Sequence, residues 1–315
     1  MTGADPGAGK IDVHAHYFGP DYLGFLERQG VDTALGRHEL AGDAALGHRL
    51  ELMDRAGIGV QIVSGAPLFP SFASAAVAAD AARRHNDELL RFVERGRGRF
   101  AGFALLPFPH VEESLAELER VGAVEGLRGC AFGITGLGRT LLEPAYEPVL
   151  SAIAARDHTV FLHPVGNACG FYPSRFDQTW LVGAVFEDSV FVADLLTSGW
   201  LEDHPALRVL IPHLGGAIPF ILQRLDDQHL ARVPGGSPPS AHAGRLWYDS
   251  VNSDPRALRL AVEALGGDRV VLGTDFPYLA GERFATAVSY LREAGLDADG
   301  LAAVERENAR ALLGA

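Results

Sequence analysis

"KIDVHAHYF", residues 10–18, is a mostly apolar run of β-strand type that carries two histidines, His14 and His16, one residue apart. Alternate side chains of a strand point to the same face, so the two imidazoles project side by side. Burying two neighbouring imidazoles without a shared partner costs free energy. The pair therefore indicates a ligand-binding site at the end of the first buried strand.

Similar apolar runs recur along the whole chain. They predict strands at residues 10–16, 60–65, 100–107, 129–134, 159–165, 208–214, 246–251 and 269–276. Most of the runs are continuously apolar, which is typical of strands buried on both faces of a parallel sheet. Amphipathic helical patterns lie between them, for example at residues 73–96, 111–123 and 255–267. The last two end in Gly-containing turns, as helix C-termini often do.

Strands that alternate with helices over 315 residues predict a (β/α)8 TIM barrel. The main alternative is an open doubly wound sheet, but no Gly-rich phosphate loop follows the first strand. We expect one domain over residues 1–315, with 1–9 as a flexible lead. Residues 17–50 and 166–200 are insertions after strands one and five. In a barrel, both would begin at the C-terminal rim, where substrates bind.

The composition narrows the classes of partner. The chain has 40 acidic and 27 basic residues, for a formal charge of −13. Such a surface disfavours nucleic acid or an anionic membrane as the main partner, and no apolar run reaches the roughly 20 residues of a membrane span. Cys130 and Cys169 are the only cysteines and have no metal-type or redox spacing. We therefore expect a reducing, cytoplasmic setting.

Polar residues gather where the predicted strands end. His14 and His16 close the first strand, His163 the fifth, His213 the sixth and Asp275 the eighth. In a barrel these ends converge on one mouth. Imidazoles and a carboxylate at one rim predict a site for a divalent cation, zinc first, although Mn²⁺, Fe²⁺ or Co²⁺ also suit such ligands.

A lone histidine is more often a core or surface residue than a ligand. We interpret the remaining histidines in this way: His38, His48, His85, His110, His158, His204, His229 and His242.

The motifs together resemble those of the amidohydrolase superfamily. They are HxH after strand one, a histidine ending strand five, "HLGG" after strand six and "GTDFP" after strand eight. The chain is most similar to the decarboxylase branch, typified by aminocarboxymuconate-semialdehyde decarboxylase, and the resemblance runs from "KIDVHAH" through "LMDRAGI" to "ENARALL". The segment "TSGWLEDHPALRVLIPHLGG" looks most like enzymes that remove CO2 from salicylate-type acids, such as 6-methylsalicylate decarboxylase.

The resemblance implies a ligand set and an acid/base residue. The metal ligands would be His14, His16, His163 and Asp275, and His213 matches the family's acid/base histidine. Many superfamily hydrolases bridge two metals with a carboxylated lysine at the end of strand four. The only lysine of this chain, Lys10, lies before strand one. A lysine-bridged pair is therefore excluded, and one metal is expected.

The resemblance also suggests residues that bind the substrate. Arg224 matches an arginine that reaches into the neighbouring subunit's site, which implies a homodimer. Arg49 matches one of two arginines that could hold a carboxylate, while Glu51 replaces the second and weakens the case for the muconate semialdehyde substrate. Trp180 and Phe276 are candidate walls for an aromatic ring. Surface position and core packing are equally good explanations of these arginines and aromatic residues.

The expected reaction is non-oxidative decarboxylation of an aromatic or conjugated small-molecule carboxylic acid, with His213 or Asp275 as the proton donor. The alternative is hydrolysis of an amide, lactone or related bond by metal-bound hydroxide. In that case Asp275 would take the proton and His213 would polarise the carbonyl. A third interpretation is a metal-binding scaffold without turnover.

Overall fold

A computed structural model describes residues 9–166 and 178–314. Eight parallel strands form one sheet in the order β1 to β8. Their bounds are β1 (Lys10–His16), β2 (Ile58–Ser64), β3 (Phe100–Leu105), β4 (Leu127–Gly133), β5 (Thr159–His163), β6 (Arg208–Ile211), β7 (Trp247–Asp249) and β8 (Val270–Val271). The segment after β8 returns to β1, where Ala15 pairs with Phe276 and the Val13 amide donates to the Leu272 carbonyl over 2.8 Å. The predicted (β/α)8 barrel is confirmed.

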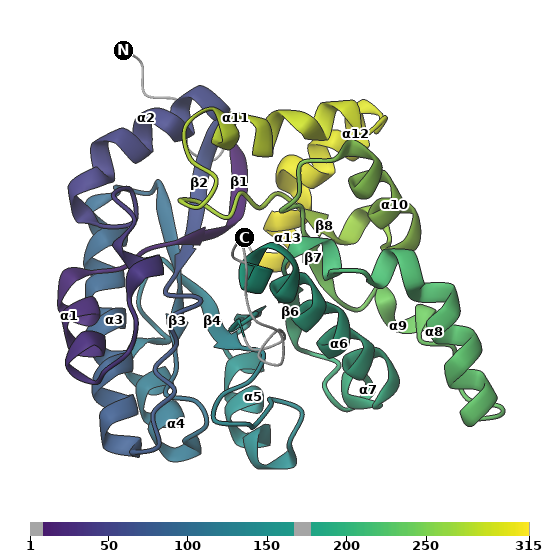
Figure 1. Cartoon of the computed structure of the whole chain (residues 1–315), viewed down its shortest axis with the longest axis horizontal. Helices are drawn as coiled ribbons and strands as arrows, with labels where there is room; N and C mark the ends of the chain where they lie inside the picture. Colours follow the sequence, from purple (N-terminus) through teal and green to yellow (C-terminus); the bar gives the residue numbers. More distant parts are fainter. Residues whose placement is uncertain (1–8, 167–177, 315) are drawn as a thin grey trace.

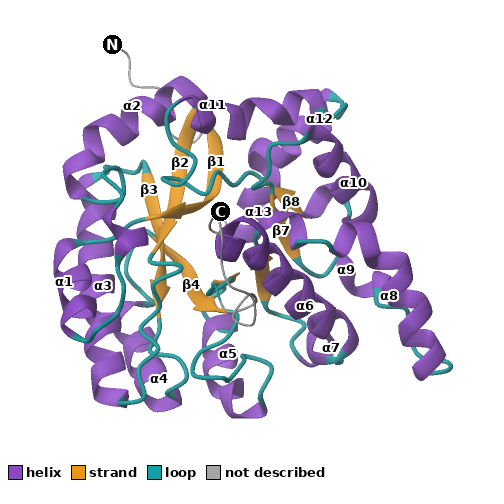
Figure 2. Ribbon diagram, viewed as in Figure 1, coloured by secondary structure: helices purple, strands orange, loops and turns teal. Residues whose placement is uncertain are grey.

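Helices surround the strands (Figures 1 and 2). They are α1 (Pro20–Arg28), α2 (Leu46–Ala56), α3 (Ala75–Arg95), α4 (Val111–Val121), α5 (Glu147–Ala154), α6 (Ala184–Thr197), α7 (Trp200–Asp203), α8 (Ile218–Arg232), α9 (Ser240–Ala243), α10 (Pro255–Leu265), α11 (Glu282–Ser289), α12 (Ala298–Ala302) and α13 (Asn308–Leu313). Local sequence explains where several begin. The Ser74 side chain caps α3, and Asp254 caps α10 with Pro255 at its first position.

The strands are buried on both faces, as their continuous apolar runs predicted. In β5, Val160 and Leu162 belong to one cluster of buried side chains and Phe161 to a second. The same alternation holds in β6, where Leu210 separates Val209 from Ile211. The two faces of these strands therefore both meet apolar neighbours. A few polar residues are buried among them, such as Asp12 of β1 and Gln61 of β2, which are joined by a 2.6 Å hydrogen bond.

Strands six to eight are shorter than predicted; the seventh, predicted over residues 246–251, spans Trp247–Asp249. β6 ends at Ile211 and β8 at Val271. His213 and Asp275 therefore do not close strands but lie in the segments that follow. Both have left-handed backbone conformations, with φ of 55° and 57°, which are incompatible with a strand. The expectation that they lie at the C-terminal rim still holds, because both segments leave the barrel there.

The two insertions have different contents. Residues 17–50 hold α1, two short 3₁₀ turns and the start of α2. From the second insertion, the structure describes a π-helical turn (η5, Thr179–Gly183) that leads into α6. The rest of it, with Cys169, lies outside the described residues, as does most of the predicted N-terminal lead. Among the helices described, none is both long and apolar enough to cross a membrane.

Candidate metal centre and active site

Four predicted ligands meet at the C-terminal end of the barrel. One ligand atom from each of His14, His16, His163 and Asp275 lies within 4.8 Å of the others. The two Nε2 atoms of His14 and His16 are 3.2 Å apart, and Oδ1 of Asp275 lies 2.9 Å from the second. The three imidazoles are buried. Residues from β1, β5 and the segment after β8 therefore converge on one point.

Hydrogen bonds orient two of the rings toward this point. Nδ1 of His14 donates to Asp249 Oδ2 over 2.6 Å, and Nδ1 of His163 donates to the Pro164 carbonyl over 2.8 Å. In the neutral form of each ring the proton is therefore on Nδ1, and Nε2 carries a lone pair. Nε2 of His163 is buried and has no hydrogen-bond partner. A buried lone pair without a donor is the condition that a metal ion satisfies.

The electrostatics of the cluster suit a cation. Burial lowers the pKa of His16 to about 4 and lowers that of His163 well below its ordinary value, so both rings are neutral at pH 7. Burial opposes ionisation of Asp275, but the hydrogen bond with His16 and the charges of His14 and His213 outweigh burial and lower the pKa of Asp275. His14 differs: burial opposes its charge, but Asp249 and Asp275 outweigh burial and raise its pKa, so a bound cation would take the place of that proton. Two neutral imidazoles, a third ring held by Asp249 and an ionised carboxylate fit a single divalent ion.

Asp249 links the cluster to His213, and sequence analysis missed it. Its Oδ2 accepts from His14, while its Oδ1 accepts from the His213 amide over 2.9 Å. The close approach needs Gly273, because a Cβ there would lie 2.8 Å from Asp249 Cβ and 3.0 Å from His14 Cβ. A signal was available: Asp249 is the acidic residue within the apolar run of strand seven.

His213 is held by a second carboxylate that the sequence did not indicate. Its Nδ1 lies 2.8 Å from Oδ2 of Asp188, a fully buried residue of α6. Gly216 lets α6 approach, because a Cβ there would lie 2.4 Å from the Val185 carbonyl oxygen. Burial disfavours the imidazolium, but the charges of Asp188, Asp249 and Asp275 outweigh it and raise the pKa of His213 to about 9.

A cavity of about 430 Å³ opens above the cluster. His163, His213 and Asp275 lie at its base. The other lining residues come from the rim: Leu35, His38, Pro67, Trp180, Leu181, Ala184, Tyr278, Leu279 and Arg283. Trp180, a candidate contact for an aromatic ring, thus lines the cavity. His38, which we interpreted as an ordinary core or surface residue, lines it too, and Tyr278 and Arg283 were not anticipated.

The other candidates for substrate binding lie elsewhere. Arg49 is 1% exposed; it donates to the His16 carbonyl over 2.8 Å and to Gln61 over 2.7 Å. Its guanidinium lies 4.5 Å from the ring centre of Phe276, which is 0% exposed. Neither residue lines the cavity, because together they fill the core beneath β1. Arg224 is exposed on α8 and is also absent from the cavity wall.

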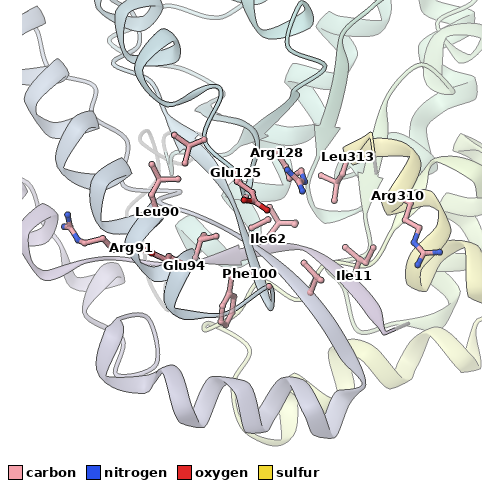
Figure 3. Close-up of a pocket in the computed structure, with 16 residues that line it drawn as sticks. Ile11, Ile62, Leu90, Arg91, Glu94, Phe100, Glu125, Arg128, Arg310 and Leu313 are labelled. Carbon is pink, nitrogen blue, oxygen red and sulfur yellow. The ribbon is translucent and has the colours of Figure 1, made fainter. Parts of the chain in front are cut away.

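A larger cavity, of about 620 Å³, lies at the opposite end of the barrel (Figure 3). Its apolar wall includes Ile11 and Ile62, and Arg91 and Arg310 stand at opposite edges. Among the described residues, side chains that could bind a metal ion come together only at the C-terminal end of the barrel. Size alone therefore does not identify the active site.

Known proteins resemble this chain over most of its length. The model of the amidohydrolase family matches residues 11–315. A 2-amino-3-carboxymuconate-6-semialdehyde decarboxylase of Dictyostelium discoideum is 30% identical over 87% of this chain and 83% of its own. A gamma-resorcylate decarboxylase of Rhodococcus jostii is 31% identical over 86% of this chain and 88% of its own.

Solved structures share the fold over nearly the full length. A 5-carboxyvanillate decarboxylase of Sphingomonas paucimobilis superposes with a TM-score of 0.81 at 26% identity, covering 97% of this chain and 99% of the other. A dihydroxybenzoic acid decarboxylase of Polaromonas, solved with manganese and 2-nitroresorcinol, superposes with a TM-score of 0.82 at 23% identity, covering 97% of each chain. Because the family model matches residues 11–315 and the fold is the same barrel, the chain belongs to the amidohydrolase family.

Proposed function

We propose that this protein is a metal-dependent, non-oxidative decarboxylase of an aromatic, salicylate-type carboxylic acid. The observation that carries the proposal is that one cavity is lined both by metal-ligand candidates, His163 and Asp275, and by His213, whose pKa is raised to about 9. A carboxylate held at the cluster would lie beside a protonated imidazole. The decarboxylases among the relatives support the same reaction.

One divalent cation would be held by His14, His16, His163 and Asp275. Three imidazoles and one carboxylate favour zinc; manganese is the alternative, as in the Polaromonas decarboxylase. When bound, the ion supplies a positive charge that fixes the substrate's carboxylate and the adjacent oxygen. Elemental analysis of the purified protein tests the identity of the metal.

His213 would act as the general acid. Its imidazolium gives a proton to the ring carbon that bears the carboxylate; the bond to the carboxylate then breaks, CO2 leaves, and the electron pair returns to the ring. Asp275 is a poorer donor because its pKa is lowered, so it is ionised at pH 7. Asp188 orients the His213 ring and stabilises its charge over a 2.8 Å hydrogen bond. Water returns the proton to His213 after each turnover.

The test is to supply the metal-loaded enzyme with salicylate-type acids and to measure CO2. The same preparation is then given lactones and amides, and acid release is measured. We expect CO2 from at least one aryl acid. Acid release from lactones or amides, without CO2 from any aryl acid, would instead support the hydrolase alternative.

We also propose a homodimer. An apolar strip runs along η5 and α6, where Leu181, Phe186 and Val190 are 68%, 55% and 63% exposed. Phe220, at the start of the neighbouring α8, is 82% exposed, and Arg224 lies one turn further along the same helix. A second copy of the chain would cover this strip and could bring Arg224 to its partner's cavity.

Two experiments test the dimer. Phe220→Glu should convert a dimer, measured by sedimentation, into a monomer. Mixing inactive Arg224→Ala and His14→Ala chains should restore roughly a quarter of wild-type activity, because mixed dimers would hold one intact site. A wild-type monomer, or no recovery after mixing, would contradict the sharing of Arg224.

We further propose a cytoplasmic location. Cys130 is buried and unpaired, which is typical of proteins kept in a reducing compartment. Cell fractionation with a specific antibody checks the location.

A further inference from the structure

The outer wall of the active-site cavity carries a positive charge without a partner. Arg283, in the first turn of α11, lines the cavity and is exposed. Arginines elsewhere on the described surface commonly pair with carboxylates, as Arg84 does with Asp21 at 2.8 Å. Within the described residues, Arg283 has no such ion pair or hydrogen bond. On a chain with a charge of −13, a free arginine facing a cavity is available for an anionic ligand.

His38 adds a second donor to the same cavity. Its Nδ1 accepts a hydrogen bond from the Leu40 amide over 3.2 Å. In the neutral ring the proton is therefore on Nε2, which can donate to a ligand. Tyr278, in contrast, already donates its hydroxyl proton to the Leu35 carbonyl over 3.3 Å. Among the described lining residues of the rim, Arg283 and His38 are thus the charged or imidazole donors that remain available to a ligand.

The rest of the rim is apolar. Trp180, Leu181, Pro67 and Leu279 offer faces for an aromatic ring. A ring that carries only apolar substituents would fill this space but leave the exposed guanidinium and the His38 donor to water. A ring with an acceptor anion remote from the reacting carboxylate would satisfy both, and a planar carboxylate suits the fork of an arginine.

We propose that the substrate is an aromatic diacid. One carboxylate is lost at the metal centre, and the second is bound by Arg283 and by Nε2 of His38. The inference rests on the proposed decarboxylase function and specifies its substrate class. In this arrangement, Arg283 and His38 determine specificity, while the proton transfer by His213 is unchanged.

The experiment compares 4-hydroxyisophthalate with salicylate, which lacks only the second carboxylate. We expect kcat/KM of the metal-loaded wild type to favour the diacid by at least about 10-fold, as a charge-assisted hydrogen bond allows. Arg283→Gln should lower kcat/KM for the diacid by about 10- to 100-fold, mainly through KM, and leave salicylate within about twofold. Arg283→Lys should restore part of the loss, and His38→Asn should show a smaller loss of the same kind.

The matched control is Arg83→Gln, because Arg83 is an exposed arginine of α3 outside the cavity. It should change neither substrate. Equal turnover of the two acids by the wild type, or an equal effect of Arg283→Gln on both, would overturn the inference while leaving the decarboxylase function intact.

A binding measurement separates this inference from the reaction. Isophthalate has no hydroxyl and resembles the diacid, and benzoate is its monoacid counterpart. By calorimetry, the wild type should bind isophthalate at least about 10-fold more tightly than benzoate, and Arg283→Gln should remove the difference. If no aryl acid tested releases CO2, the proposed function fails, yet this binding difference still decides whether Arg283 recognises a second carboxylate. Equal affinities in the wild type would reject that role.

Discussion

The two ends of the barrel differ in chemistry more than in size. The N-terminal end holds the larger cavity, about 620 Å³ against about 430 Å³, with apolar strand starts and charged helix residues at its edges. The smaller cavity at the C-terminal end has His163, His213 and Asp275 at its base. The comparison teaches that buried polar groups, not volume, mark the end of the barrel that carries the reaction.

Strained backbone also occurs at the active-site residues themselves. His213, Leu214 and Asp275 have φ between 55° and 57°, and each such conformation costs on the order of 1 kcal/mol for a residue other than glycine. The hydrogen bonds of His213 and Asp275 with Asp188, Asp249 and His16 hold these conformations in place. Such strain persists because the surrounding contacts determine the position of each side chain.

Removing a metal ligand should produce the largest difference between the two ends. His163→Ala should abolish stoichiometric metal binding, measured by elemental analysis, and lower kcat/KM by about 1000-fold or more. His229→Ala, on α8 and away from the cavity, is the control and should retain metal and activity. A fully active, metal-free His163→Ala protein would contradict the assignment of the reaction to this end.

Loss of the general acid should separate catalysis from metal binding. His213→Ala should lower kcat by about 100- to 10,000-fold, because proton delivery is lost. The metal content should stay near one per chain, since His213 is not among the four clustered ligands. Unchanged turnover with the metal in place would favour the scaffold interpretation.

Removal of Arg49 should destabilise the fold beneath the site. Arg49→Ala leaves the His16 carbonyl and Gln61 without their donor and should lower the free energy of unfolding by about 2–5 kcal/mol in urea titrations, since each unsatisfied buried acceptor costs about 1–3 kcal/mol. Arg128→Ala, in the wall of the N-terminal cavity, is the control and should cost less than about 1 kcal/mol. A stable Arg49→Ala protein with a raised KM alone would instead support direct contact with substrate.

The protonation of His213 should depend on Asp188. Nearby carboxylates outweigh burial and raise the pKa of His213 from 6.5 to about 9. Protonation of His213 therefore stabilises the folded state fully below pH 6.5, and this contribution is lost as the pH rises through 9. In the metal-free protein, NMR titration should show a lower pKa in Asp188→Asn, and the alkaline loss of stability should start at lower pH. Equal pKa values in the two proteins would show that Asp188 has no such effect.

The smallest effect is expected at the N-terminal end. Arg91 is an exposed residue at the edge of that cavity, far from the clustered ligands along the barrel axis. Arg91→Gln should leave kcat/KM within about twofold of wild type, as surface substitutions usually do. A larger loss would show that the two ends are coupled.

Much of the barrel could be predicted from local patterns. The apolar runs predicted all eight strands, and the first was predicted with its observed bounds, Lys10–His16. The four metal-ligand candidates could also be predicted, because histidine and aspartate stand out where apolar strands end. The shortened β6 and β8 were not predicted, since the left-handed backbone at His213 and Asp275 depends on contacts with other segments.

The sequence by itself determined the barrel and the donor types of its metal centre, because strand periodicity and the placement of polar residues are local properties. Only the tertiary structure decided which charges serve the site. It turned Arg49 into the core, brought Asp188 from α6 to His213 and left Arg283 facing the cavity. These contacts join residues far apart in the chain, and their energies depend on burial and distance, which no local pattern contains.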